Sequence, residues 1–309
     1  MTSHSDPDRY GQHGQLGGVG RFEPAGPPAQ RGPQSGPSAG IGQQADAGEL
    51  PADGELPADG ELPADGELPA DGELPADGEL PAVELRLENA RAGYRTIEVL
   101  HGITMAIPSG AVTALLGANG AGKSTTLRVI AGLIPLRSGT LSWRDEQITK
   151  MTTVNRARRG LMLVPDERAV FATLSVRDNL QIIAEASGNP DISPALDAFP
   201  RLRERLGQRA GSMSGGERRM LALARALLAR PSVLMVDELS LGLSPKVASE
   251  LFAWLGTVAD AGTTVILADQ YTEEALALAD MVYVLHRGEV TFAGTPAELG
   301  ASELLAAGA

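Results

Sequence analysis

A glycine-rich loop between an apolar run and a helical stretch is the feature that most constrains the fold of this chain. The loop, GANGAGKST at residues 117–125, follows the apolar run 111–116 and leads into the helical pattern 123–131. It fits G-x-x-x-x-G-K-[ST], in which backbone N–H groups of a strand–loop–helix turn surround phosphate groups. A chance match is expected in roughly one chain in a hundred of this size. The flanking patterns make chance rarer still, so the sequence predicts a nucleotide site.

The side chains of this loop have separate expected tasks. Lys123 is expected to reach the β- and γ-phosphates, and the Ser124 hydroxyl is expected to ligate Mg²⁺. The glycines let the backbone N–H groups turn inward on the phosphates. The predicted nucleotide-binding residues of the loop are Gly117, Asn119, Gly120, Ala121, Gly122, Lys123, Ser124 and Thr125.

Two adjacent carboxylates, Asp237 and Glu238, follow the apolar run 233–236. Such a pair at the end of a buried strand is uncommon without a cation, because an unpaired buried charge is costly. We predict that Asp237 holds Mg²⁺, directly or through water, and that Glu238 polarises an attacking water. The alternative is an ordinary turn from strand to loop.

From Val83 onward the chain alternates strand and helix patterns, which is typical of an α/β domain with a mainly parallel central sheet. The expected strands of that sheet are 111–116, 161–164, 233–236 and 264–268. The expected helices are 123–131, 175–186, 217–229, 246–259 and 272–279. Shorter strands between residues 83 and 110 indicate an antiparallel layer at one edge. Thr295 and Glu298 form an expected capping box.

Residues 1–82 differ in composition from the rest of the chain. They hold three of the 26 basic and fifteen of the 39 acidic side chains, and ELPADG repeats five times from Glu49. A six-residue period is one that parallel β-helices use. Each unit, however, has two acidic residues, one Pro, one Gly and only one Leu, too little apolar surface to offset the entropy of ordering. We predict a disordered acidic tail at 1–82; docking to a basic protein is a further interpretation that rests on charge alone.

Composition excludes several classes of site and protein. The chain has no cysteine, which excludes disulfides, thiolate zinc sites and cysteine nucleophiles, and its four histidines show no metal-ligand spacing. Net charge of −13 and 4% aromatic residues argue against nucleic-acid binding. The sequence has no apolar run of spanning length, and its polar N-terminus lacks the apolar stretch of a signal peptide. These features predict a cytoplasmic protein.

A third motif, Met213 to Arg219 (MSGGERR), lies about twenty residues before Asp237. Ser214 and Glu217 fit a capping box, and two glycines leave backbone donors open at a helix N-terminus, which favours an anion site. Together with GANGAGKST and VLMVDE, this stretch resembles the signature loop of ATP-binding-cassette (ABC) ATPases over about residues 83–300. The resemblance implies that Ser214, Gly215, Gly216 and Glu217 contact ATP bound at the P-loop of a second cassette.

The family resemblance extends the expected fold and site. It implies an α/β P-loop NTPase of ABC type at 83–309, with a small helical subdomain at about 167–212. It places Tyr94 against adenine, although edge packing is an alternative, and Asp166 in the Q-loop as a ligand of nucleotide and Mg²⁺. Gln270 stands in the switch region, where most cassettes have His and where it can still bind a phosphate oxygen. The expected catalytic residues are Glu238, Lys123 and Gln270, and the expected Mg²⁺ ligands are Ser124, Asp237 and Asp166.

Some positions depart from the family pattern. Asp166 stands where the family has Gln or Glu, so its carboxylate has a shorter reach. Ala118 replaces the usual Pro of the P-loop, and Leu239 replaces the Pro after the catalytic Glu, which predicts a looser D-loop at 240–243. Because Glu238 is retained, we expect hydrolysis of ATP.

The finer pattern is similar to one ATPase subunit of the branched-chain, or hydrophobic, amino acid uptake family. This implies hydrolysis of MgATP at the cytoplasmic face of a membrane. The implied partners are permease subunits, a second cassette (identical or different) and, indirectly, a periplasmic solute-binding protein. No nucleic-acid partner is expected. A urea or amide importer has a similar subunit. The rivals are a soluble cassette protein acting on ribosomes or in DNA repair and a non-hydrolysing ATP-binding regulator.

Two arginine groups receive plainer interpretations. Arg156, Arg158 and Arg159 are expected on a solvated face or a salt-bridged turn. The arginines at 201, 203, 205 and 209 are expected either to be solvated or to meet the permease.

Overall fold

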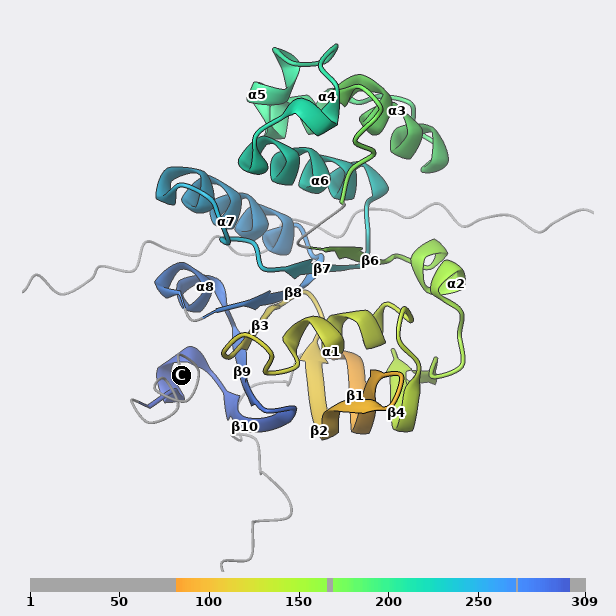
Figure 1. Ribbon diagram of the computed structural model, residues 1–309, viewed down its shortest axis with the longest axis vertical. Helices are drawn as coiled ribbons and strands as arrows, with labels where there is room; N and C mark the ends of the chain where they lie inside the picture. The colour runs from red at the N-terminus through yellow and green to blue at the C-terminus, as the bar shows by residue number, and fades with distance from the viewer. Residues whose placement is uncertain (1–81, 166–168, 271, 301–309) are drawn as a thin grey trace, which may run out of the picture. The chain divides into compact units, whose positions relative to one another are not determined.

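The computed structural model describes residues 82–165, 169–270 and 272–300 (Figure 1). Its strands are β1 (Val83–Tyr94), β2 (Ile97–Pro108), β3 (Val112–Leu116), β4 (Leu136–Trp143), β5 (Glu146–Gln147), β6 (Leu161–Val164), β7 (Val233–Asp237), β8 (Thr264–Asp269), β9 (Met281–His286) and β10 (Glu289–Gly294). Its α-helices are α1 (Lys123–Ile130), α2 (Thr153–Arg158), α3 (Val176–Ala186), α4 (Ser193–Ala198), α5 (Pro200–Arg203), α6 (Gly215–Ala229), α7 (Pro245–Asp260) and α8 (Glu273–Leu278). The expected acidic tail, apart from Ala82, and Asp166 lie outside the described residues.

A six-stranded sheet of order β10-β9-β3-β8-β7-β6 forms the centre of the fold. Strands β9, β3, β8, β7 and β6 are parallel, and β10 pairs antiparallel with β9 at one edge. All residues of β3, β7 and β8 are buried, which is why these strands read as continuous apolar runs rather than as alternating patterns. The expectation of a mainly parallel central sheet is confirmed.

A second, antiparallel sheet has the order β2-β1-β4-β5. The antiparallel layer is confirmed, but β1 and β2 have twelve residues each and are not short. Their pairing register shifts at several points along the two strands. These irregularities interrupt the alternation of apolar and polar residues, so the pattern in the sequence looked like shorter strands.

Two hydrophobic cores lie on opposite faces of the six-stranded sheet. One face of the sheet packs with α3, α6 and α7, including the buried residues Leu180, Leu221 and Leu255. The other face packs with α1 and the antiparallel sheet, including Leu127 and Leu87. Helix α1, which begins with the P-loop lysine, is therefore fixed between two sheets. Within the described residues no helix is both long enough and apolar enough to cross a membrane.

Helices α3 to α6 lie together beyond the β6–β7 end of the sheet (Figure 1). Capping boxes begin α3, through Ser175 and Asp178, and α6, through Ser214 and Glu217. Helices α4 and α5 have six and four residues. They lie within the expected helical subdomain at about 167–212, but the sequence predicted no individual helix there, since one or two turns show no helical periodicity. The Thr295–Glu298 capping box is present, but it begins a 3₁₀ turn at Pro296–Glu298.

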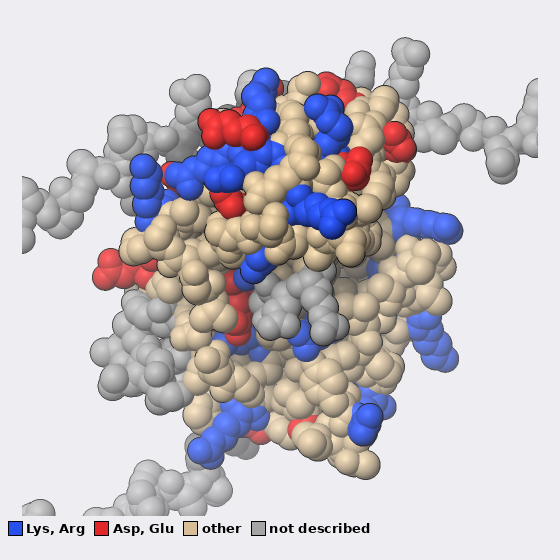
Figure 2. Space-filling view, turned by 45° about the horizontal axis from the view of Figure 1, so that its top comes forward, with Lys and Arg blue, Asp and Glu red and all other residues tan. Residues whose placement is uncertain are grey.

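Three of the four arginines of the stretch 201–209 form ion pairs at the surface. Arg201 pairs with Glu250, Arg203 with Asp197 and Arg205 with Glu217, at 3.3, 2.6 and 2.7 Å. Figure 2 shows basic and acidic side chains intermixed over this face. Exposed pairs of this kind contribute little to stability, about 0–1 kcal/mol each.

The interpretation of Arg156 as a surface residue is wrong. Its side chain is buried, with 4% of its surface exposed, whereas Arg158, the last residue of α2, and Arg159, which follows it, are exposed. The Arg156 guanidinium donates hydrogen bonds of 2.7–3.1 Å to the carbonyls of Val129, Ile130, Ile148, Thr149 and Met151. Two of these carbonyls, those of Val129 and Ile130, belong to the last turn of α1, where a helix lacks intrahelical donors, although the Val129 carbonyl also accepts from the Gly132 N–H. Arg156 thus caps the helix that carries the P-loop lysine.

Candidate functional site

Three loops converge at the carboxyl ends of three neighbouring strands. The P-loop follows β3, Asp269 ends β8 and Asp237 ends β7, and these strands are adjacent in the order β3-β8-β7. The strands run parallel, so their carboxyl ends lie at one edge of the sheet. Ligand sites of open α/β sheets form at such an edge. The fold therefore brings together the three loops that the sequence analysis assigned to one nucleotide.

Two glycines of the P-loop combine a positive φ angle with a lack of room for any side chain. Gly117 and Gly122 have φ angles of 149° and 113°. A Cβ atom at Gly117 would lie 2.3 Å from the Leu285 carbonyl oxygen, and one at Gly122 would lie 2.9 Å from a Leu100 methyl group. The loop is thus pressed against β9 and β2, and its shape depends on both glycines.

Lys123, the first residue of α1, folds back over this loop. Its Nζ donates to the carbonyl oxygens of Gly117 and Ala118 at 2.6 and 3.0 Å, and only 4% of the residue is exposed. Burial lowers the pKa of the Lys123 ammonium, and the charges of Glu238, Asp269 and Asp237 oppose that shift. One cation among three carboxylates is an arrangement suited to a polyanion accompanied by a divalent cation.

Ser124 and Asp237 meet across the site. The Ser124 hydroxyl donates to Oδ1 of Asp237 at 2.8 Å, although 113 residues separate the two in the chain. Asp237 is 1% exposed. A hydroxyl and a carboxylate oxygen beside the phosphate loop suit Mg²⁺, which takes oxygen ligands and is held by few protein groups together with phosphates and water. These two of the expected Mg²⁺ ligands therefore fit the ion, and the third, Asp166, lies outside the described residues.

Glu238 follows Asp237 with a left-handed backbone, at φ 48°. Its N–H donates to the Ala268 carbonyl at 2.7 Å, and its own carbonyl accepts a 2.7 Å hydrogen bond from Arg219. A non-glycine residue adopts this conformation at a cost, and such strain gathers at functional positions. The residue is partly exposed.

Gln270 contacts the P-loop directly. Its Nε2 donates to Oδ1 of Asn119 at 3.1 Å. Its backbone N–H donates to the buried carboxylate of Asp269, which also accepts from the N–H and hydroxyl of Ser240 at 3.2 and 3.0 Å. Burial raises the pKa of Asp269, and these hydrogen bonds oppose the rise. Hydrogen bonds thus connect the P-loop, the switch residue and the start of the D-loop.

Leu239, the residue before the D-loop, is fully buried in the core under α6 and α7. The next residue, Ser240, is held by Asp269. The residue that replaces the family's Pro is therefore an apolar anchor. Leu241, by contrast, is 56% exposed, and Gly242 has a φ of 71°.

Tyr94 ends β1 beside the P-loop helix. Its hydroxyl accepts a 2.8 Å hydrogen bond from Arg128 of α1, and the residue is 42% exposed. An exposed aromatic ring at this place is available to a flat ligand. The hydrogen bond fixes the ring relative to the same helix that carries Lys123.

The signature residues lie at the N-terminus of α6. Ser214 N–H donates to Glu217 at 3.0 Å, and the hydroxyl of Ser214 accepts from Glu217 N–H at 3.3 Å. The hydrogen bond from Ser214 N–H holds the pKa of the Glu217 carboxyl below its usual value. A Cβ atom at Gly215 would meet nothing within 4 Å. The capping box is confirmed, and a ligand could approach the backbone at Gly215 closely.

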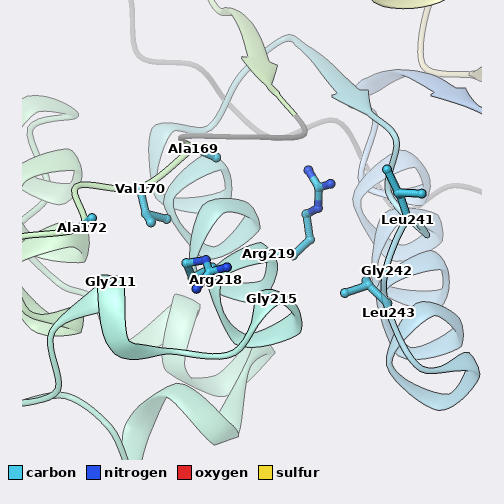
Figure 3. Close-up of a pocket in the computed structure, with 10 residues that line it drawn as sticks. All are labelled: Ala169, Val170, Ala172, Gly211, Gly215, Arg218, Arg219, Leu241, Gly242 and Leu243. Carbon is cyan, nitrogen blue, oxygen red and sulfur yellow. The ribbon is translucent and has the colours of Figure 1, made fainter. Parts of the chain in front are cut away.

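A pocket of about 560 Å³ lies beside this helix terminus. Figure 3 shows Arg219 extending from α6 between the segment at 169–172 and the D-loop segment at 241–243. Gly211, Gly215 and Arg218 complete the wall on the side of α6. The signature and D-loop residues of this chain thus line one cavity, whereas the P-loop is not part of its wall.

Sequence reasoning missed two residues of this region, Arg219 and Asp269. Arg219 is 8% exposed and Asp269 is 2% exposed. A basic residue near a helix start looks like a solvated one, and an acidic residue at a strand end looks like the beginning of a loop. Only Asp269 could have been found from the sequence, because it follows an apolar run in the same way as Asp237.

Comparison with known proteins identifies the family. The sequence model of the ABC transporter family matches residues 100–240. The chain is 37% identical over 219 residues to the high-affinity branched-chain amino acid transport ATP-binding protein BraG of Pseudomonas aeruginosa, covering 70% of this chain and 94% of BraG. It is 39% identical to the probable branched-chain amino acid transport ATP-binding protein LivF of Archaeoglobus fulgidus, covering 70% of this chain and 93% of LivF. It is 31% identical to the lipopolysaccharide export system ATP-binding protein LptB of Escherichia coli, covering 70% and 92%.

Solved structures agree with this fold. The ADP conformation of MJ1267, an ATP-binding cassette of an ABC transporter, matches with a TM-score of 0.62 at 23% identity, covering 72% of this chain and 93% of that one. The dimeric, post-hydrolysis cassette MJ0796 bound to ADP and phosphate matches with a TM-score of 0.62 at 17% identity, covering 69% and 98%. The chain therefore belongs to the ABC transporter family, is an ATP-hydrolysing subunit, and has branched-chain amino acid transport ATP-binding proteins among its relatives.

Proposed function

We propose that this chain is the ATPase subunit of an importer for branched-chain or other hydrophobic amino acids, acting at the cytoplasmic face of a membrane. The observation that carries this proposal is its similarity to BraG and LivF, each covered over more than nine-tenths of its length. Glu238 and the paired Ser124 and Asp237 supply the groups that hydrolysis of ATP requires.

Each residue of the site has a task in that reaction. Lys123 binds the β- and γ-phosphates, and Ser124 and Asp237 hold Mg²⁺, with Asp166 as a further proposed ligand. The ion, when bound, offsets negative charge on the phosphate oxygens. Glu238 orients the attacking water and accepts its proton, and Gln270 hydrogen-bonds a phosphate oxygen.

Each nucleotide is proposed to lie between two cassettes. The signature of this chain, Ser214–Glu217, would contact the ATP bound at the P-loop of a second cassette, identical or different. Three observations support this arrangement: the open approach at Gly215, the cavity shared by signature and D-loop, and the dimer formed by the similar cassette MJ0796. An anion bound at the start of α6 is favoured by the N–H groups and dipole of the helix.

The permease subunits are proposed to dock on an apolar surface between α2 and α3. A groove of about 640 Å³ there is lined mainly by apolar residues, Leu133, Leu161 and Ile183 among them, together with Thr153, Arg158 and Ser187. Several large apolar side chains near it are exposed, namely Leu133, Val154 and Ile182, at 57%, 57% and 42%. Apolar surface of this kind marks a protein interface. Permeases, in turn, receive the solute from a periplasmic binding protein.

One observation favours a second function. The chain is 31% identical to LptB over 92% of the length of LptB, so a subunit that powers lipid export is the alternative. Both functions share the ATP chemistry and differ in the membrane partners.

Purification from membranes, followed by reconstitution, tests the proposal. The tagged full chain should co-purify from detergent with permease subunits and, when present, a second cassette identified by mass spectrometry. Proteoliposomes containing the complex, the binding protein and internal ATP should accumulate radiolabelled leucine, whereas those with the Lys123→Ala chain should not. Recovery of lipid-export permeases would support the alternative. Recovery of soluble partners alone, or none, would rule out both transport functions.

Tyr94 yields a quantitative prediction for nucleotide affinity. Tyr94→Ala should weaken ATP binding about 5- to 150-fold, because stacking of one aromatic ring on a base contributes on the order of 1–3 kcal/mol. Tyr94→Phe keeps the ring and loses only the hydrogen bond to Arg128, so it should bind ATP within about twofold of the parent chain. Titration with a fluorescent ATP analogue measures both. Equal affinity in Tyr94→Ala would mean that the ring only packs at the sheet edge.

A further inference from the structure

We propose that Arg219 is a positioning residue that couples the signature helix to Glu238. The proposal rests on the proposed function, in which Glu238 orients the attacking water. Arg219 lies in the second turn of α6, five residues after Ser214, and is 8% exposed. Neither the sequence pattern nor the expected tasks of the three motifs assigned it a role.

The guanidinium of Arg219 reaches the backbone of two other loops. Its Nη1 donates to the carbonyl of Pro165 at 2.9 Å and to that of Asp237 at 3.3 Å, and its Nη2 donates to the carbonyl of Glu238 at 2.7 Å. Pro165 follows β6 and begins the Q-loop, whereas Asp237 and Glu238 end β7. One side chain therefore binds the signature helix, the start of the Q-loop and the catalytic turn together.

The contact acts where the catalytic turn is strained. Glu238 has a φ of 48°. Its N–H donates to the Ala268 carbonyl, and its own carbonyl accepts from Arg219. A left-handed glutamate persists only where the surroundings hold it. Arg219 supplies the part of that support that comes from outside the sheet, so loss of its hydrogen bonds lets the turn relax and redirects the Glu238 carboxylate.

Arginine is suited to this position by its shape. A planar guanidinium has five donors in a fixed arrangement and stays charged when buried. Lysine has a single nitrogen on a flexible stem and cannot span carbonyls of two loops in the same way. Charge-assisted hydrogen bonds to carbonyls are also stronger than neutral ones.

Coupling between the two nucleotides of a cassette pair follows from this connection. The signature of a chain contacts the nucleotide of its partner, whereas Glu238 of the same chain acts on its own nucleotide. A shift of α6 when the partner's nucleotide binds would pass through Arg219 to the Glu238 turn. The geometry thus points to a cassette pair in which ATP hydrolysis at one nucleotide site responds to nucleotide binding at the other.

The experiment measures single-turnover release of γ-phosphate by the full chain, together with affinity for a fluorescent ATP analogue. Arg219→Met should slow hydrolysis about ten- to a hundredfold while affinity changes by less than about threefold, and Arg219→Lys should fall between Met and the parent. The cooperativity of turnover with ATP concentration should also decrease. The matched control is Arg230→Met, which removes an exposed arginine from the end of the same helix and should change neither quantity.

A double-mutant cycle with Glu238→Gln shows whether Arg219 acts through Glu238. In the Glu238→Gln chain, Arg219→Met should slow the residual rate by less than about twofold, because the group that it positions is already absent. An equal loss in both backgrounds, or parent-like turnover in Arg219→Met, would overturn the inference. Should Arg219→Met fail to fold, the same rates are compared for Arg219→Lys in the parent and Glu238→Gln backgrounds. Parent-like turnover in Glu238→Gln alone would instead overturn the proposed catalytic role of Glu238.

Discussion

ATP hydrolysis should fall about a hundred- to a thousandfold in the Glu238→Gln chain, with ATP binding retained. The amide keeps the size and backbone preference of the side chain but cannot accept a proton from water. Loss of a general base typically removes a factor of about 10²–10⁴ in rate. Lys123, Ser124 and Asp237, which are proposed to bind the nucleotide and Mg²⁺, keep their hydrogen bonds. Phosphate release and nucleotide titration on the same preparation measure the two effects separately.

Glu250→Gln is the matched control for this change. Glu250 is exposed on α7, where it pairs with Arg201, so the same chemical replacement occurs away from the sheet edge. Its turnover should stay within about twofold of the parent, since exposed pairs contribute little. If Glu238→Gln also retained parent-like turnover, another group would have to act as the base. Loss of ATP binding in Glu238→Gln would show that Glu238 holds the nucleotide rather than the water.

Arg156→Met should lower the free energy of unfolding by about 3–5 kcal/mol. The substitution removes a buried cation and leaves five backbone carbonyls without its hydrogen bonds. The carbonyls of Val129 and Ile148 keep the N–H groups of Gly132 and Met151 as donors, so three of the five lose the donor that Arg156 supplies. An unpaired buried carbonyl costs about 1–3 kcal/mol, and a rearrangement of the chain recovers part of that. Urea titrations followed by circular dichroism measure the shift in midpoint at constant slope.

Arg158→Met provides the comparison from the same helix. Arg158 is exposed, so its replacement should change the free energy of unfolding by less than about 0.5 kcal/mol. Because Arg156 caps α1, its loss should also weaken ATP binding at concentrations of urea too low to unfold the chain. A stability change in Arg156→Met no larger than that in Arg158→Met would show that the carbonyls find other donors.

Much of the fold followed from periodicity and motif spacing. The buried strands β3, β7 and β8 have continuous apolar sequences, and the P-loop and the Ser214–Glu217 capping box mark the starts of α1 and α6. The short helices α4 and α5 and the length of β1 could not be predicted. They depend on tertiary contacts and on irregular strand register, which leave no period in the sequence.

The site was predictable in its motifs and unpredictable in the connections between them. Glycine, lysine and paired carboxylates at fixed spacing indicate phosphate chemistry, and the structure brings Ser124 and Asp237 together as that chemistry requires. Arg156, Arg219 and Asp269 depend instead on carbonyls and donors far away in the chain. Backbone carbonyls leave no pattern in the sequence, so an arginine that binds them looks like a surface charge.

Position 238 is one at which function and stability favour different amino acids. The left-handed backbone there, at φ 48°, suits glycine better than any residue with a Cβ atom. A chain selected for folding alone would gain from glycine at this turn, and a chain selected for turnover keeps the carboxylate despite the strain. Methods that choose residues by their fit to the backbone would therefore tend to remove the catalytic group. Consensus or stability-guided redesign of this cassette must hold residue 238 fixed.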